Sequence, residues 1–210
     1  MSKQQRLTLH ITLFNQNRRA DVLATLTVGE LIQEILVAFG TQMRFLDQHQ
    51  PDRYQLSLPE SAEPLAETVA LAQCVANEDQ LIFAERSVLI PSGAQPLETP
   101  FYLRYRSHVF PVTWQPAIIG RPEPGAEQND WLAINLESCS HAVSRQHAEI
   151  VAKDGRWFVR QLAANPVLLN GVPLPFNEQD NSRSPLVPFD LGATIHLTRS
   201  GISLFCLAKT

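Results

Sequence analysis

No apolar run in this sequence approaches the roughly 20 residues of a membrane-spanning helix, so no membrane span is predicted. The first residues also lack the apolar stretch of a signal peptide. Cysteine is scarce: the three cysteines, Cys74, Cys139 and Cys206, are far apart and odd in number. They predict neither a disulfide framework nor a metal site. Together these absences favour a reducing, cytoplasmic location.

Clusters of basic residues are missing as well. The chain of 210 residues has a net charge of −4, but residues 1–88 hold 7 basic and 11 acidic side chains, whereas residues 101–210 hold 10 and 9. General nucleic-acid binding requires Lys and Arg gathered on one face, so no nucleic-acid partner is predicted. Any anion that binds would have to contact a few individually positioned side chains, because no broad basic surface is predicted.

Short signatures of catalysis are also absent. The sequence has no G-x-S-x-G elbow, no P-loop, no H-E-x-x-H motif and no C-x-x-C pair. Ser144 and His147 could be drawn as a nucleophile and its base, or Cys139, His141 and His147 as metal ligands. No motif supports either set, so the chain is predicted to be no enzyme and to need no metal or cofactor.

A change of composition divides the chain in two. Residues 87–100, SVLIPSGAQPLETP, hold three prolines and a glycine and show no helical or strand period. This stretch predicts a linker between one domain at residues 1–86 and another at residues 101–210. The alternative is a long loop inside a single domain, which is uncommon at this length.

The first domain has the pattern of an α+β β-grasp fold. Alternating or extended patterns predict strands at residues 7–13, 20–26, 54–58 and 80–85. Turn residues at 15–17 join the first two strands. Thr27 and Glu30 have the spacing of a capping box, which predicts the start of a helix that ends near Gly40.

The runs LTLHITLFNQNRRADVLATLTVGELIQEIL and PLAETVALAQCVANEDQLIF resemble the bacterial ubiquitin-like domains of the YukD type. The resemblance covers about residues 6–86 and implies a surface that docks a second protein. No Gly-Gly pair ends this domain, so conjugation through a free C-terminal glycine is not expected.

The second domain has short extended segments separated by Gly, Pro, Asn or Asp, and no convincing helix, which predicts an all-β sandwich. The segments are residues 101–112, 117–119, 147–152, 157–162, 167–169, 194–197 and 202–206. Three motifs occur among them in this order: IGR at 119–121, VSRQHA at 143–148, and Asn165 followed by the Asn170-Gly171 pair. The ordered set resembles the signature of forkhead-associated (FHA) domains, β-sandwiches that bind phosphothreonine on a partner protein.

Phosphate needs several converging donors and at least one fixed cation. Arg121, Ser144 and Arg145 are therefore expected to contact the phosphate, and the resemblance implies that Asn165 contacts the peptide backbone. It also implies that the remaining motif residues shape the loops: Gly120, His147, Asn170 and Gly171. The alternatives are that the arginines are solvated surface side chains and that Ser144 only caps a turn.

Two residues depart from the FHA pattern. Ala164 stands where the family commonly has Ser or Thr, and Pro166 removes a backbone N–H and restricts Asn165 toward extended geometry. The loop between Arg121 and Ser144 is also longer than usual. Two hypotheses follow: a phosphothreonine-dependent signalling adaptor whose ubiquitin-like half docks another protein, or a phosphorylation-independent scaffold, for example of a type VII-like secretion assembly.

Overall fold

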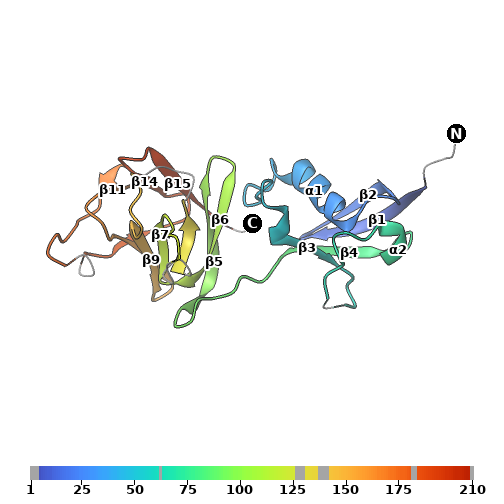
Figure 1. The fold of residues 1–210 in the computed structure, drawn as a ribbon, viewed down its shortest axis with the longest axis horizontal. Helices are drawn as coiled ribbons and strands as arrows, with labels where there is room; N and C mark the ends of the chain where they lie inside the picture. The colour runs from blue at the N-terminus through green and yellow to red at the C-terminus, as the bar shows by residue number, and fades with distance from the viewer. Residues whose placement is uncertain (1–4, 62, 126–130, 137–141, 181–183, 209–210) are drawn as a thin grey trace. The chain divides into compact units, whose positions relative to one another are not determined.

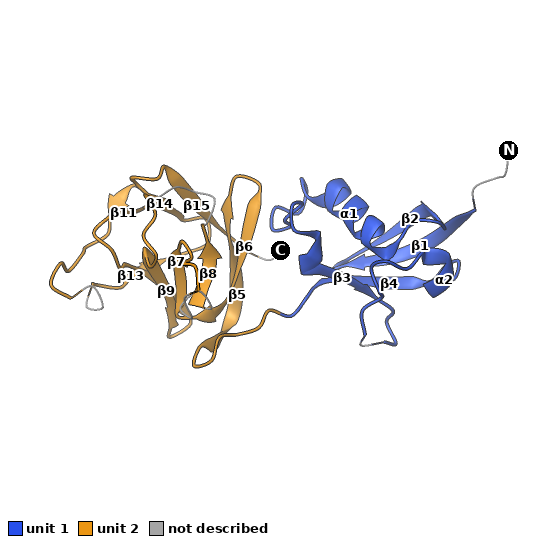
Figure 2. Cartoon of the chain, in the orientation of Figure 1, with its two compact units in different colours: residues 1–87 blue, residues 88–210 orange. Residues whose placement is uncertain are grey.

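The structure is a computed structural model that describes residues 5–61, 63–125, 131–136, 142–180 and 184–208 (Figure 1). The chain divides into two compact units, Met1–Ser87 and Val88–Thr210, called unit 1 and unit 2 below (Figure 2). Within the described ranges, no helix is long and apolar enough to cross a membrane.

Unit 1 is built on one four-stranded sheet in the order β2-β1-β4-β3. Its strands are β1 (Arg6–Leu13), β2 (Gln16–Leu23), β3 (Tyr54–Ser57) and β4 (Gln80–Glu85). β1 and β4 run parallel in the centre, and the outer strands pair with them antiparallel. The strand order is that of the predicted β-grasp. Along β1, Leu7, Leu9, Ile11 and Leu13 are buried and the residues between them are not, as the alternation predicts.

Helix α1 (Val28–Phe39) starts with the predicted capping box. The Glu30 backbone N–H donates to Thr27 Oγ1 at 3.2 Å, and the Thr27 N–H donates back to Glu30 Oε2 at 2.8 Å. These bonds satisfy N–H groups that the helix itself cannot pair. The buried stripe of α1 consists of Val28, Leu31, Ile32, Ile35 and Leu36. A 3₁₀ turn (Pro51–Arg53) and helix α2 (Leu71–Cys74) are too short to give a periodic signal and were not predicted.

The first hairpin turns earlier than predicted. Its two turn residues are Phe14 and Asn15, and β2 runs over Gln16–Leu23 rather than residues 20–26. Phe14 takes a φ of 55°, and its ring packs edge-on to Phe45 with centroids 4.9 Å apart. A second edge-on contact joins the ring of Phe14 to that of Phe83, with centroids 6.1 Å apart.

Unit 2 is a sandwich of two sheets. Its strands are β5 (Gln95–Tyr105), β6 (His108–Gln115), β7 (Ala117–Gly120), β8 (Leu132–Asn135), β9 (Ala148–Lys153), β10 (Arg156–Gln161), β11 (Val167–Leu169), β12 (Val172–Pro173), β13 (Val187–Phe189), β14 (Thr194–Leu197) and β15 (Ile202–Leu207). One sheet has the order β13-β10-β9-β7-β8 and the other β12-β11-β14-β15-β5-β6. The apolar residues that face inward from both sheets form a single core.

An aromatic contact joins the two sheets. The ring of Phe101 on β5 lies 5.2 Å from that of Trp157 on β10 and 5.8 Å from that of Phe189 on β13. Each such pair stabilises a fold by about 0.5–1.5 kcal/mol beyond its buried area. The tryptophan at the start of one predicted strand is therefore partly buried and packs against the core.

The linker prediction was wrong for residues 95–100, which belong to β5. Gln95 and Pro96 pair with β6, and the Leu97 side chain is 6% exposed and part of the core. Of the three prolines that suggested a linker, Pro91 lies before β5, and Pro100 lies where the pairing register shifts, between Pro96 and Phe101. A proline is tolerated in such an irregularity, as at Pro100, because residues there are left out of the regular strand pairing.

The single strand predicted at residues 101–112 is also corrected. The chain turns at Arg106 and Ser107, with Arg106 at a φ of 55°, so β5 and β6 form a hairpin. Strands β8, β12 and β13 were not predicted. They have four, two and three residues, too few for an alternating pattern to be recognised.

Replacing Thr27 by Ala removes the capping box. We expect the free energy of unfolding of unit 1 to fall by about 1 kcal/mol, measured by hydrogen exchange of the buried β1 and β4 amides in the full chain. Thr41→Ala is the matched control, since Thr41 is exposed and follows α1. Equal losses in the two variants would contradict a special role for the cap.

Candidate functional site

Three loops meet at one end of the unit 2 sandwich, and backbone hydrogen bonds hold them together. Arg121, directly after β7, donates its N–H to the Ser144 carbonyl at 3.2 Å. The His147 N–H donates to Ile119 O at 2.8 Å, and the Leu162 N–H donates to His147 O at 3.0 Å. The ends of β7 and β10 and the segment before β9 are thereby tied to one another. The IGR and VSRQHA motifs lie on two of these segments, at the end of β7 and before β9.

Gly120 allows the closest of these contacts. A Cβ placed on Gly120 would lie 1.8 Å from the carbonyl oxygen of Arg145, far inside van der Waals contact. Gly120 also accepts a hydrogen bond from the Leu136 N–H at 2.8 Å. Any side chain here would push the Ser144-Arg145 segment away from β7. The glycine of the IGR motif is therefore a requirement of backbone packing.

The guanidinium of Arg121 is half-buried and oriented by the neighbouring loop. Its Nε donates to the Val143 carbonyl at 2.9 Å. In the part of the chain that the structure describes, no carboxylate forms an ion pair with Arg121. Its terminal nitrogens are left to bind an anion, on a side chain whose direction is already set.

Arg145 differs from Arg121 in both exposure and pairing. Its side chain is 58% exposed, and Nη2 lies 2.7 Å from Oε1 of Glu123. The two cations predicted at the site are therefore not equivalent. Of these two, Arg121 is the one that is anchored by a hydrogen bond and has no carboxylate partner among the described residues.

Asn165 reaches across to the segment before β9. Its Nδ2 donates to Ala142 O at 3.1 Å and to Ser144 Oγ at 3.3 Å. An amide nitrogen has two hydrogens, so both are used, and the amide oxygen remains as an acceptor. Because the Ser144 hydroxyl accepts in this bond, its own hydrogen is left to donate to a ligand.

The turn that carries Asn165 is organised by Gln161 and Thr198, which the sequence analysis did not identify. Gln161 Nε2 donates to Ala163 O at 2.7 Å, and its Oε1 accepts the Val167 N–H at 3.0 Å. The backbone N–H and hydroxyl of Thr198 both donate to Pro166 O, at 3.2 and 3.1 Å. One signal was present: Gln161 is a polar residue in the register of core-facing Val159.

The Asn170-Gly171 pair forms the predicted tight turn. Both residues have positive φ, 51° and 84°, as a type I′ hairpin requires, and they connect paired Leu169 and Val172. Asn170 Oδ1 accepts the Thr194 N–H at 2.9 Å. The pair shapes the β11–β12 hairpin, and among the described residues it forms no hydrogen bond with Arg121 or Ser144.

His147 is 1% exposed and braces the segment before β9. Its Nδ1 lies 3.1 Å from the Ser144 backbone nitrogen and accepts that N–H, so the proton of the neutral ring is on Nε2. Nε2 has no hydrogen-bond partner among the described residues. Burial lowers the pKa of His147 to about 4, against a smaller opposing effect of the Asn165 backbone.

These contacts bear on the alternative catalytic and metal-binding sets. It is the Ser144 backbone N–H, and not its hydroxyl, that bonds to His147, so the pair lacks the geometry of a nucleophile and its base. Cys139 and His141 lie outside the described residues. Within the described part of the chain, no group of three His, Cys, Asp or Glu side chains could hold a metal ion.

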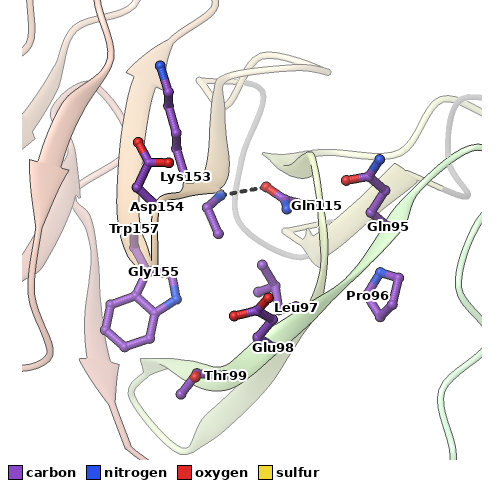
Figure 3. Close-up of a pocket in the computed structure, with 11 residues that line it drawn as sticks. Gln95, Pro96, Leu97, Glu98, Thr99, Gln115, Lys153, Asp154, Gly155 and Trp157 are labelled. Atoms are coloured by element: carbon purple, nitrogen blue, oxygen red, sulfur yellow. Dashed lines mark hydrogen bonds between the residues drawn. The ribbon is translucent and has the colours of Figure 1, made fainter.

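A cavity of about 300 Å³ lies at the other end of strand β9 (Figure 3). Its lining comes from residues 95–99, Gln115, residues 152–155 and Trp157. β9 has six residues, which separates the cavity from the three loops by about 20 Å. Lys153 is accompanied there by the carboxylates of Glu98 and Asp154, a poor environment for an anion. The loop end is therefore the better candidate.

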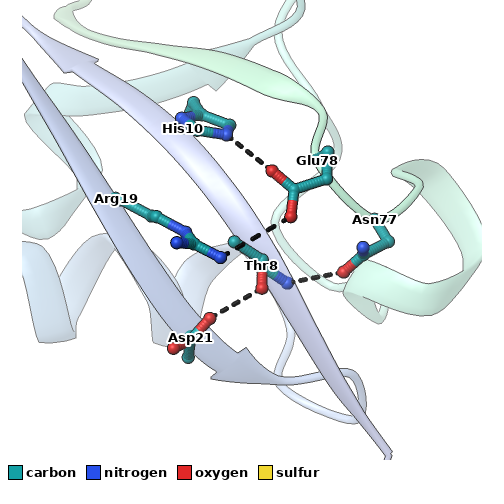
Figure 4. A network of polar contacts seen from close by, with 6 residues as sticks. All are labelled: Thr8, His10, Arg19, Asp21, Asn77 and Glu78. Atoms are coloured by element: carbon teal, nitrogen blue, oxygen red, sulfur yellow. Dashed lines mark hydrogen bonds and ion pairs between the residues drawn. The ribbon is translucent and has the colours of Figure 1, made fainter.

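In unit 1, polar contacts cover the sheet face opposite the buried residues of β1 (Figure 4). Thr8 Oγ1 donates to Asp21 Oδ1 at 2.7 Å across the β1–β2 pair. Glu78 contacts His10 Nε2 at 2.8 Å and Arg19 Nη2 at 3.8 Å. Recognition on this face would use hydrogen bonds and ion pairs more than apolar burial.

One protein-family model matches part of unit 2. The FHA domain family model matches residues 117–181. Mycobacterium tuberculosis EmbR, solved with a low affinity phosphopeptide, is similar at 23% identity and a TM-score of 0.39, over 53% of this chain and 26% of that one. This chain thus spans about a quarter of EmbR.

Two further solved structures are similar. The FhaA FHA domain, complexed with the intracellular domain of Rv3910, has 17% identity and a TM-score of 0.38 over 50% of this chain and 98% of that one. Caldiarchaeum subterraneum ubiquitin has 18% identity and a TM-score of 0.31, over 40% of this chain and 98% of that one. No curated protein sequence matches this chain.

The low pKa of His147 predicts that unit 2 loses stability in mild acid. The unfolded chain takes up the imidazole proton near pH 6.5 and the folded one only near pH 4, so stability decreases as the pH falls through this window. The full effect is about 3 kcal/mol. Urea unfolding followed by tryptophan fluorescence measures it, since Trp114, Trp131 and Trp157 all lie in unit 2.

The His147→Asn variant keeps an acceptor for the Ser144 N–H but cannot titrate. We expect lower stability at pH 7 and a shallower decline between pH 6.5 and 4. His196→Asn, which replaces a half-buried histidine on β14 of the same unit, should retain the steep decline. An unchanged slope in His147→Asn would show that other groups cause it.

Proposed function

Residues 117–181 of this chain form an FHA domain, and on that premise we propose that unit 2 binds a phosphothreonine segment of a partner protein at the loops that carry Arg121, Ser144 and Asn165. The observation that carries the proposal is the state of Arg121. This cation is aimed by a hydrogen bond to Val143 O and has no carboxylate partner in the described ranges. A phosphate dianion is the ligand that best satisfies such a group.

The remaining contacts of the phosphate follow from the neighbouring donors. The Ser144 hydroxyl accepts from Asn165 and has a hydrogen to donate. Arg145 can add a second cation. Charge-assisted hydrogen bonds contribute about 1.5–3 kcal/mol each, so three of them, less the costs of ordering and desolvation, suit an affinity in the micromolar range. Reversible binding of this strength is what a signalling module needs.

The peptide backbone has a defined acceptor at Asn165. Its Nδ2 is occupied by Ala142 O and Ser144 Oγ, so we propose that its Oδ1 accepts a peptide N–H. The neighbouring Ala164 is exposed and offers no hydroxyl. Discrimination between phosphothreonine and phosphoserine is therefore expected to depend on shape, without a side-chain hydroxyl from this turn.

For unit 1 we propose a second docking surface, so that the chain acts as a non-catalytic adaptor between two proteins. The support is its β-grasp topology and the polar face formed by Thr8, His10, Arg19 and their partners. Side chains of both signs on that face suit a partner of mixed charge.

The Arg121→Ala variant tests the phosphate site. Titration with a phosphothreonine peptide library should show binding by the wild type and roughly ten- to hundredfold weaker binding by the variant, since one or more charge-assisted bonds are lost. Arg156→Ala is the matched control. Arg156 is exposed and is the first residue of β10, whereas the proposed site lies at the other end of that strand. It removes the same charge and should bind as the wild type does.

The unphosphorylated library separates the two functional hypotheses. An adaptor that depends on phosphothreonine loses binding when the peptides are dephosphorylated. Equal binding of both libraries would instead favour a phosphorylation-independent scaffold. Wild-type affinity in Arg121→Ala would remove Arg121 from the site.

A further inference from the structure

The ion pair between Glu123 and Arg145 places a carboxylate inside the proposed phosphate site. Glu123 lies two residues after Arg121, and its Oε1 is 2.7 Å from Nη2 of Arg145. The Glu123 side chain is 37% exposed and that of Arg145 is 58% exposed. The carboxylate of Glu123 therefore pairs with the more exposed of the two cations when no ligand is bound.

The backbone around Glu123 restricts where this carboxylate can go. Pro122 and Pro124 flank it, and each has a fixed φ near −65°. The following proline also biases Glu123 itself toward extended geometry. One end of the loop is held at Arg121 by the hydrogen bond to Ser144 O. Glu123 is thus presented beside the site by a stiff segment.

We propose that Glu123 is a built-in competitor for Arg145, so that only a dianionic phosphate, and not a carboxylate side chain, recruits the second cation. The inference rests on the proposed phosphothreonine function and names the class of ligand that satisfies it. A phosphorylated threonine carries about −1.5 to −2 charges at pH 7 and attracts Arg145 more strongly than the single charge of Glu123. An Asp or Glu in the peptide has no such advantage.

The pair does not serve mainly to stabilise the fold. Exposed ion pairs contribute little to stability, because solvent screens them and two long side chains must be ordered. Its position matters more, since a carboxylate beside the phosphate site repels an incoming anion and also satisfies Arg145. Both effects weaken ligand binding in the same direction.

Glu123→Gln removes the competing charge and keeps the shape of the side chain. We expect it to bind a phosphothreonine peptide roughly three- to tenfold more tightly than the wild type, measured by calorimetry on the full chain. The same peptide with Glu in place of phosphothreonine should gain by a larger factor, so discrimination between phosphate and carboxylate decreases. Asp154→Asn, at the far β9–β10 turn, removes the same charge and should leave both affinities unchanged.

A double-mutant cycle assigns the effect to Arg145. In an Arg145→Ala background, Glu123→Gln should add less than half of its effect, because the cation for which it competes is gone. Unchanged peptide affinity in Glu123→Gln, or an equal gain in the Arg145→Ala background, would overturn the competitor role.

Inorganic phosphate separates failure of this inference from failure of the proposed function. Phosphate binding to the wild type and to Glu123→Gln can be followed by the NMR signals of the arginine side chains. If the wild type binds no phosphopeptide, but Glu123→Gln binds inorganic phosphate more tightly, the peptide-binding function fails and the competitor role stands. If inorganic phosphate binds equally to both proteins or to neither, the competitor role is wrong.

Discussion

The proposed site depends on the contact of Gly120 with the carbonyl of Arg145, which leaves no space for a Cβ atom. This contact brings the Ser144-Arg145 segment directly onto the end of β7. This close approach allows two hydrogen bonds. The Arg121 N–H donates to Ser144 O, and Arg121 Nε donates to Val143 O. Without the approach, Arg121 would be an ordinary surface arginine with many orientations and a larger entropic cost of binding.

The turn that carries Asn165 is held in place by side chains rather than by a close backbone contact. Ala164 and Pro166 lack groups that are common in FHA domains, and from sequence they weaken the expected turn. The Gln161 amide nevertheless closes this turn from within the sandwich, and Thr198 holds the Pro166 carbonyl from β14's end. The position of Asn165 is thus maintained by side chains outside the motif. Compared with the FHA pattern, the turn lacks a side-chain hydroxyl at Ala164.

The sequence predicted the structure correctly where a few neighbouring residues determine it. The Thr27–Glu30 capping box and the type I′ turn at Asn170 are of this kind. Prediction failed where pairing between strands distant in the sequence determines the local structure. Pro96 suggested a linker, yet Trp114 pairs with it and makes it part of β5. The FHA resemblance could be recognised because its motifs occur in a fixed order over several loops. The family match confirms it.

The same distinction applies to the charges of the site. Arg121 and Arg145 are alike in the sequence, and nothing in their motifs distinguishes an anchored cation from a paired one. Glu123 pairs with Arg145, 22 positions later in the chain, only because Gly120 brings their two loops together. His147, buried and neutral beside them, adds no charge at pH 7. The positive charge offered to a ligand is therefore smaller than the motif suggests, and it is concentrated on Arg121.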